Sequence, residues 1–271
     1  MRVFIDGLSS LAHTITRKLV DAHDINPCDI LVNTYDRTDT IDYRSWLDSR
    51  SIRWTIASYQ DQSTINQIAQ FDPDLILSAY GLRIIPVSVL DLSHMAINMH
   101  PSYLPDYKGR WVCPWAIING EVEHGITFHS MTAKIDVGDI LFQKKVPITV
   151  DETAWSLYNK LIAEFVREFD NFFKALKEQR LDSKPMPNGG RFFRQGLPFD
   201  GMIDTSWNAD QIERFIRAMF FPPHLGAIIK IHGTRYECDS YEKYLALTSQ
   251  DKKSSYQRLP ESIDDNLTSS K

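Results

Sequence analysis

Three polar side chains in two short segments could together carry out an acyl transfer. Asn98 and His100 leave the end of a predicted strand two positions apart, so their side chains point to the same side of it. Asp136 lies in a predicted turn between two later strands. An amide can stabilise negative charge on a carbonyl oxygen, and an imidazole beside a carboxylate can take a proton from an attacking amine. With these groups the reaction needs no nucleophile from the protein.

The chain around these residues is predicted to be irregular but rigid. Pro101 and Pro105 prevent a strand or helix from continuing past His100. Open α/β sheets bind their ligands at such loops, and neither His100 nor Asp136 is expected in the core. From spacing alone a structural interpretation is equally open. In it, Asn98 and His100 only form hydrogen bonds that stabilise the strand end and the loop, and Asp136 only stabilises its own turn.

Alternating short apolar runs and amphipathic segments in the first half predict the sheet that positions this loop. Apolar runs of three residues are typical of strands buried on both faces, and the segments between them have the spacing of crossover helices. The pattern predicts an α/β fold with a doubly wound, mostly parallel, Rossmann-like sheet. The predicted strands are 3–5, 30–32, 54–56 and 75–77, and the predicted helices are 11–20, 43–48 and 65–69.

The second half is predicted to complete this first domain, which we assign to residues 1–181. Further strands are expected at 95–97, 125–131 and 140–142, and a long amphipathic helix at 153–177 with Asp151 or Thr153 as its N-cap. Turn-forming residues from 182 to 190 then indicate a linker.

Residues 182–247 are predicted to form a small C-terminal α+β unit for substrate binding or dimerisation. A unit of this size buries little apolar surface by itself, and the apolar edge of its hairpin would be exposed. We therefore expect a symmetric homodimer that forms through the hairpin. Residues 248–271 lack periodicity and are predicted to be disordered. The expected elements are a strand at 191–193, a helix at 209–220 capped by Asn208, and a hairpin at 227–236 with Ile228, Ile229 and Ile231.

The composition excludes several classes of protein. With 271 residues, 43% hydrophobic and 24% charged, the chain is neither a disulfide miniprotein nor a disordered one. Its net charge of −5 gives no general attraction for nucleic acid. Three scattered cysteines and the lack of a long apolar run predict a soluble, cytoplasmic protein. His124 and His129 lack a third ligand, so no metal is expected.

Several ordered motifs surround the three polar residues. NMHPSYLP at 98–105 is followed by YKGR at 107–110, PWAI at 114–117, GITFH at 125–129 and DVGDI at 136–140. In this order and spacing, over about residues 75–146, the sequence resembles the N10-formyltetrahydrofolate-dependent formyltransferases. Tyr103 stands where that family often has leucine, so the shape of one neighbouring wall differs.

The resemblance implies a role for each of these residues, with N10-formyltetrahydrofolate as co-substrate. Asn98 and His100 would stabilise the tetrahedral oxyanion, and Asp136 would hold the His100 ring and assist proton transfer. His129 would be a supporting hydrogen-bonding group. The implied folate contacts, largely through backbone groups, are Leu82, Arg83, Ile84, Arg110, Thr132, Ala133, Lys134 and Ile135.

The segment after the catalytic motifs indicates the acceptor. GRFFR at 190–194, DGMID at 200–204 and FPP at 221–223 are similar to the sugar N-formyltransferase branch, which acts on nucleotide-linked amino sugars. Cations would bind the diphosphate, and flat rings the base and the sugar. Two other roles are equally open: the phenylalanines of this segment as the core of a hairpin, and its arginines as solvated surface. The expected substrate contacts are Ser9, Ser10, Ser102, Tyr103, Trp111, Arg191, Phe192, Phe193 and Arg194.

The reaction expected on this basis is formyl transfer to a dTDP-linked amino-dideoxyhexose, for O-antigen or other lipopolysaccharide assembly. The 4-amino-4,6-dideoxyglucose and 3-amino-3,6-dideoxyhexose acceptors are equally open, and a UDP-linked amino sugar is an alternative. A methionyl-tRNA formyltransferase would need a cationic surface that this composition does not offer. A protein that binds nucleotide sugars without catalysis would not need the three polar residues.

Overall fold

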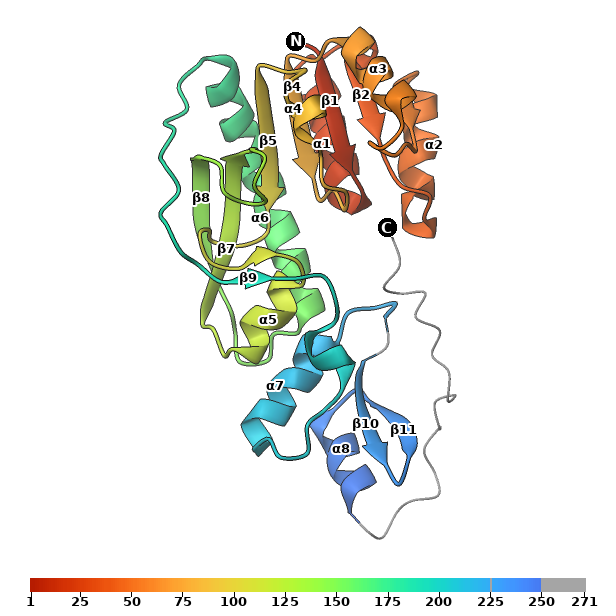
Figure 1. Ribbon diagram of the computed structural model, residues 1–271, viewed down its shortest axis with the longest axis vertical. Helices are drawn as coiled ribbons and strands as arrows, with labels where there is room; N and C mark the ends of the chain where they lie inside the picture. The colour runs from red at the N-terminus through yellow and green to blue at the C-terminus, as the bar shows by residue number, and fades with distance from the viewer. Residues whose placement is uncertain (225, 250–271) are drawn as a thin grey trace. The chain divides into compact units, whose positions relative to one another are not determined.

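Seven strands form one sheet in a computed structural model, which describes residues 1–224 and 226–249 (Figure 1). The order is β3-β2-β1-β4-β5-β7-β8, with parallel pairing from β3 through to β5 and antiparallel pairing of β5 with β7. This confirms the predicted doubly wound, mostly parallel sheet. The strands are β1 (Val3–Gly7), β2 (Ile30–Asn33), β3 (Arg53–Thr55), β4 (Leu75–Ala79), β5 (Met95–His100), β7 (Glu123–Ser130) and β8 (Ile140–Pro147).

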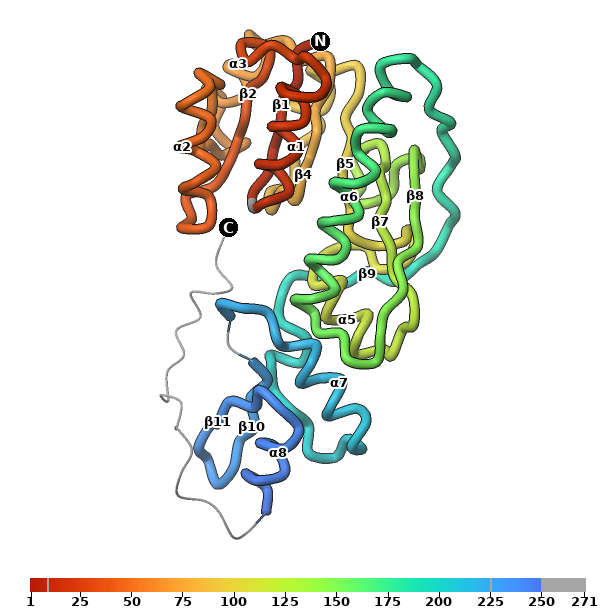
Figure 2. The backbone as a smooth tube through the Cα atoms, turned by 180° about the vertical axis from the view of Figure 1, so that it is seen from behind, coloured from red at the N-terminus to blue at the C-terminus, as the bar shows by residue number. Residues whose placement is uncertain are grey.

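Helices connect and cover these strands. Figure 2 shows the sheet from behind, with α1 and α6 in front of it. The predicted N-cap of the long helix is Thr153, whose hydroxyl accepts a hydrogen bond from the Ser156 amide at 3.1 Å. The α-helices are α1 (Ser9–Asp21), α2 (Ile41–Ser49), α3 (Gln62–Phe71), α4 (Val87–Leu90), α5 (Val112–Ile118), α6 (Ala154–Lys177), α7 (Ala209–Met219) and α8 (Tyr241–Thr248). Short 3-10 helices are η1 (Pro27–Asp29), η2 (Thr38–Thr40) and η3 (Pro198–Gly201).

Apolar side chains fill the space between the sheet and these helices. One cluster joins strand residues such as Phe4 and Ile76 to Ile68 of α3 and Val89 of α4. Elsewhere Phe128 of β7 stacks on a ring of α6, Phe172, with 4.1 Å between the centroids. Burial of strands on both faces explains their continuous apolar runs.

The chain divides into two compact units, each assembled from separate stretches. Unit 1 comprises residues 1–105, 125–144 and 161–189, and unit 2 comprises residues 106–124, 145–160 and, within the described chain, 190–249. The first unit holds the parallel strands. The assignment of residues 1–181 and 182–247 to separate functional domains stays a prediction.

Unit 2 contains the predicted hairpin and capped helix. β10 (Ala227–Ile231) pairs antiparallel with β11 (Thr234–Cys238), and β6 (Lys108–Gly109) pairs parallel with β9 (Phe192–Phe193). Asn208 and Gln211 form a capping box at the start of α7. Ile228 and Ile229 are buried because α7 contacts β10 and α8 contacts β11. The prediction that the hairpin exposes an apolar edge is therefore wrong for Ile228 and Ile229. The homodimer that was inferred from that edge stays a prediction.

The predicted disordered tail falls mostly outside the described chain. Thr248 ends α8 and Ser249 follows it, and residues 250–271 lie outside the described residues. Within residues 1–224 and 226–249, no helix combines the length and apolarity that a membrane span requires.

Candidate active site

The structure brings the three predicted catalytic side chains together at the end of β5, in unit 1. His100 Nδ1 lies 3.6 Å from Asp136 Oδ1, and Asn98 Nδ2 lies 3.4 Å from the same oxygen. His100 and Asp136 are buried and Asn98 is half-buried. The expectation that His100 and Asp136 would lie outside the core is wrong for both, because the loop that follows β5 folds back against β7 and the turn that carries Asp136 is bonded to the end of β7. Strand alternation does direct both β5 side chains to one carboxylate oxygen.

His129 completes this cluster from the neighbouring strand. It faces Asn98 across the antiparallel β5–β7 pair, with its Nε2 3.2 Å from Asn98 Nδ2 and 3.6 Å from Asp136 Oδ1. Its Nδ1 lies 2.8 Å from the Ser130 carbonyl oxygen. We therefore assign the ring proton to Nδ1, which leaves Nε2 to accept from the Asn98 amide. This contact orients the NH2 end of Asn98 toward the cluster.

The turn that carries Asp136 is held against the end of β7. Asp136 has a left-handed backbone with φ of 51°, which aspartate tolerates better than most residues. The Ser130 amide donates to the Asp139 carbonyl oxygen at 2.9 Å. A Cβ on Gly138 would lie 1.7 Å from the Ser130 carbonyl oxygen, so only glycine fits there.

Replacing Gly138 with alanine should therefore displace this turn. Because the clash is with the Ser130 backbone, the turn must shift and carry Asp136 out of its position, and we expect kcat to fall roughly 10- to 100-fold. Val137→Ala, which trims a side chain that is exposed in the same turn, should leave kcat within about twofold. Steady-state kinetics and melting curves on both variants test this. A Gly138→Ala enzyme with the wild-type rate would show that the position of the turn is not critical.

The loop after β5 is anchored by Thr127. Its hydroxyl donates to the Ser102 carbonyl oxygen at 2.7 Å and accepts from the Leu104 amide at 3.2 Å. Gln143 Nε2 donates to the Leu104 carbonyl oxygen at 2.6 Å. Ser102 is fully buried by this arrangement, so its predicted contact with the substrate is wrong. The neighbouring Tyr103 is exposed, and its contact with substrate stays a prediction.

The predicted folate contacts in unit 1 belong to two accessible segments. Leu82 and Arg83 are half-buried and Ile84 is exposed, in the turn that follows β4. Residues 132–135 follow β7 and are all exposed. Of the expected phosphate contacts, Ser9 begins α1, with one residue between it and the end of β1, and Ser10 is exposed in the first turn of that helix. These roles stay predictions.

Arg191 forms ion pairs that the sequence did not predict. In unit 2 its Nε lies 2.9 Å from Asp106 Oδ1, its Nη2 lies 2.7 Å from Glu121 Oε1, and its guanidinium carbon lies 4.2 Å from the Tyr107 ring centroid. These bonds from the guanidinium hold the pKa of Asp106 below its usual range. Two carboxylates balance this cation, which disfavours a role in binding phosphate, and its contact with substrate stays a prediction.

Arg191→Gln should therefore affect folding rather than substrate binding. The ion pairs are partly exposed, so we expect a loss of about 1 kcal/mol, which lowers the melting temperature by about 2–4 °C. The KM for the nucleotide substrate should stay within about twofold. Thermal melts and initial rates test this, and a tenfold rise in that KM would support the phosphate role.

The remaining predicted contacts in unit 2 divide into packed and exposed side chains. The Phe193 ring stacks on Tyr107 and Trp115, with centroid distances of 5.3 and 4.8 Å, so it packs within unit 2, and its contact with substrate stays a prediction. Arg110 donates its backbone amide to the Phe193 carbonyl oxygen at 3.0 Å. Phe192 and Arg194 are exposed, and Trp111 is half-buried at the start of α5. The roles of Arg110, Trp111, Phe192 and Arg194 stay predictions.

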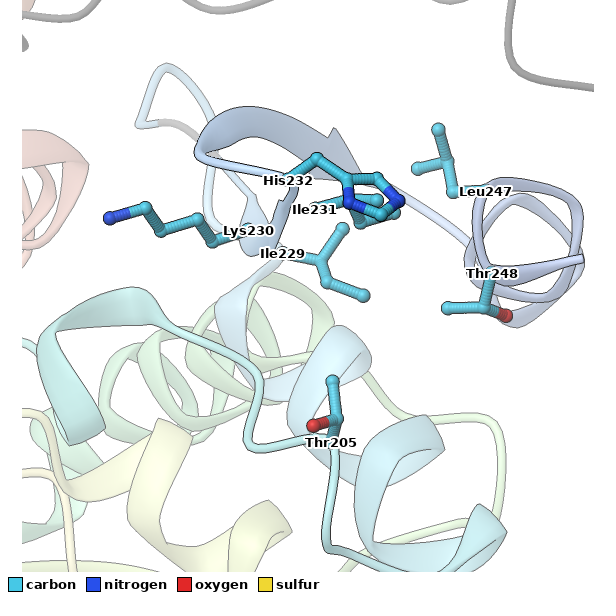
Figure 3. Close-up of a pocket in the computed structure, with 7 residues that line it drawn as sticks. All are labelled: Thr205, Ile229, Lys230, Ile231, His232, Leu247 and Thr248. Atoms are coloured by element: carbon cyan, nitrogen blue, oxygen red, sulfur yellow. The ribbon is translucent and has the colours of Figure 1, made fainter. Parts of the chain in front are cut away.

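Unit 2 also has a hollow of about 330 Å³ beside the β10–β11 hairpin (Figure 3). Its lining contains none of the predicted site residues, and it has no cluster of groups suited to catalysis. Across residues 1–224 and 226–249, no three or more His, Cys, Asp or Glu side chains are placed to hold a metal ion. The hollow is lined by Thr205, Ile229, Lys230, Ile231, His232, Leu247 and Thr248.

Comparison with known proteins gives consistent matches. The family model described as formyl transferase matches residues 25–167. GDP-perosamine N-formyltransferases of Brucella melitensis and Brucella abortus are each 37% identical over 204 residues, which cover 75% of this chain and 78% of those proteins.

Solved structures share the fold. An N-formyltransferase from Helicobacter canadensis, in complex with folinic acid and dTDP-3-aminofucose, has a TM-score of 0.73 at 22% identity, covering 89% of this chain and 87% of that one. A 4-N formyltransferase from Francisella tularensis has a TM-score of 0.71 at 19% identity, covering 88% and 96%.

Proposed function

Because the chain belongs to the formyl transferase family, in its sugar N-formyltransferase branch, we propose that it transfers the formyl group of N10-formyltetrahydrofolate to the amine of a nucleotide-linked amino sugar. One structural observation carries the assignment of the catalytic site. Asn98 and His100 converge on a single oxygen of Asp136, at 3.4 and 3.6 Å. This cluster has the hydrogen-bond donors and proton acceptors that amine attack on a formyl group requires.

Asn98, His100 and Asp136 each have a role in the reaction. When the sugar amine attacks the formyl carbon, a C–N bond forms and negative charge develops on the formyl oxygen. An N–H of Asn98 and the ring of His100 stabilise that charge. Asp136 holds the imidazole and accepts the amine proton, directly or through a water molecule. The bond to N10 then breaks, and tetrahydrofolate leaves with a proton on that nitrogen.

We place the folate against two backbone segments of unit 1. Residues 82–84 follow β4, and β4 lies beside β1 in the sheet. The chain proceeds from β1 to β2 on one side and from β4 to β5 on the other, so this is the topological switch point where open α/β sheets bind ligands. Residues 132–135 precede Asp136, so a ligand on them lies next to the catalytic carboxylate.

The identity of the nucleotide has two candidates. The 37% identity over 75% of this chain to GDP-perosamine N-formyltransferases favours a GDP-linked amino sugar. The motifs after residue 189 favoured a dTDP-linked 3- or 4-amino-dideoxyhexose. The formylated product would serve surface polysaccharide assembly in either case.

An acceptor screen tests the proposal directly. Purified protein with N10-formyltetrahydrofolate is offered GDP-perosamine, dTDP-4-amino-4,6-dideoxyglucose, a dTDP-3-amino-3,6-dideoxyhexose, a UDP-linked amino sugar and methionyl-tRNA. Tetrahydrofolate release and the mass of the product are measured for each. Turnover with a nucleotide sugar supports the proposal and identifies the base and the amine position. Sugar binding without turnover would indicate a non-catalytic module, and turnover with the tRNA alone would overturn the sugar assignment.

A further inference from the structure

The backbone conformation of the turn after β4 must be stabilised by residues outside the turn. We define the folate turn as residues 80–84. Its first residue, Tyr80, has φ of 63°, a conformation that is uncommon for a bulky side chain. Such backbone persists only where neighbouring groups hold it in place. The folate turn lies at the switch point between β1 and β4, so its backbone position affects any ligand bound there.

Tyr35, which follows β2, supplies this support. Its hydroxyl oxygen accepts hydrogen bonds from the Leu82 amide at 2.6 Å and the Arg83 amide at 3.0 Å. The same hydroxyl donates to Asp6 Oδ2 at 3.2 Å. Both lone pairs and the proton are thereby used. Burial raises the pKa of Tyr35, so the hydroxyl keeps the proton that it donates.

Asp6 in β1 fixes the position of the Tyr35 hydroxyl. Its side chain is fully buried, and its Oδ1 accepts from Asn33 Nδ2 at 3.3 Å. Burial raises the pKa of Asp6 to about 6, so above that pH its carboxylate is ionised. A Cβ on Gly81 would lie 2.2 Å from Asp6 Oδ2. The folate turn therefore packs directly on the carboxylate, and any side chain at position 81 would displace either the carboxylate or the turn.

The Arg83 side chain is held on the sheet side of the turn. Its guanidinium carbon lies 4.0 Å from the Tyr35 ring centroid, and its Nη1 donates to the Thr34 carbonyl oxygen at 3.1 Å. The same Nη1 lies 4.0 Å from Asp6 Oδ1. With the guanidinium engaged there, Arg83 can present its backbone to a ligand.

We propose that Tyr35, braced by Asp6, is a positioning residue for the folate co-substrate, because it sets the backbone of Leu82 and Arg83. This rests on the proposed function, in which the folate binds against that turn. Tyr35 acts through the turn and is not part of the cluster around Asp136. Its loss should therefore weaken folate binding and leave the chemical step unchanged.

Tyr35→Phe isolates the hydroxyl, since the ring that stacks under Arg83 stays. We expect the KM for N10-formyltetrahydrofolate, and the Kd for folinic acid measured by calorimetry, to rise roughly tenfold. The kcat and the KM for the amino sugar should stay within about twofold. Gly81→Ala pushes the turn from the other side and should weaken folate binding to a similar extent.

Tyr43→Phe is the matched control. Tyr43 is also buried in unit 1, and its hydroxyl bonds to Thr16 Oγ1 at 2.6 Å, so this variant loses a buried hydroxyl that does not contact the folate turn. It should melt at a lower temperature, with the Kd for folinic acid unchanged. Equal weakening by Tyr43→Phe and Tyr35→Phe, or a wild-type Kd in both Tyr35→Phe and Gly81→Ala, would overturn the positioning role. A wild-type protein that binds no folate would instead refute the proposed function on which this role rests.

Discussion

His100→Asn should lower kcat for formyl transfer by roughly 10²- to 10³-fold, the loss expected when one group that stabilises an oxyanion is removed. Asparagine can donate a hydrogen bond, but its shorter side chain cannot place the donor where the imidazole stabilises the developing charge. It also cannot maintain the contact that places His100 Nδ1 3.6 Å from Asp136 Oδ1. Since the loss falls on the chemical step, KM for both substrates should change much less than kcat.

The burial of His100 makes a stability control necessary. Its side chain is only 5% exposed, so the substitution can also loosen the end of β5. His94→Asn makes the same change at an exposed histidine of unit 1 and should leave kcat within about twofold. Melting curves measure the folded fraction of each variant. A loss of rate in His100→Asn that matched only its loss of folded protein would point to a structural role.

Asp136→Asn should also cause a large loss of kcat, roughly 10²- to 10⁴-fold. The side chain keeps its shape, so the change removes mainly the charge. The single oxygen that faces Asn98, His100 and His129 at 3.4 to 3.6 Å either becomes a neutral carbonyl or is replaced by an NH2 group that opposes the Asn98 amide. In both cases the imidazole loses its anionic partner.

Asp139→Asn is the comparison for this second substitution. Asp139 is exposed three residues further on in the same turn, and its carboxylate bonds to Ser183 Oγ at 3.0 Å. We expect its kcat within about twofold of wild type. Single-turnover measurements with bound folate separate the chemical step from binding. Comparable single-turnover rates for Asp136→Asn and Asp139→Asn would remove Asp136 from the mechanism.

Local sequence rules predicted most of the elements and the common side of Asn98 and His100, and the family resemblance added Asp136. Strand periodicity directed Asn98 and His100 to the same side, because successive side chains alternate across a strand. Capping residues such as Thr153 and Asn208 marked helix starts, since their side chains satisfy nearby amides. The short elements α4, α5, α8 and β6 were not predicted, because a few residues carry too little periodicity to indicate an element.

The tertiary structure alone decided which polar and apolar side chains are available to a ligand. Arg191 is balanced by Asp106, 85 residues away in sequence, and the Tyr35 hydroxyl is held by Asp6 and by amides 47 and 48 residues away. No local pattern encodes such pairs. By itself the sequence determined the sheet and the three groups that converge in it. Only the folded chain determined which charges are neutralised and which side chains are covered, because charge pairing and burial depend on partners that the sheet topology brings together from distant segments.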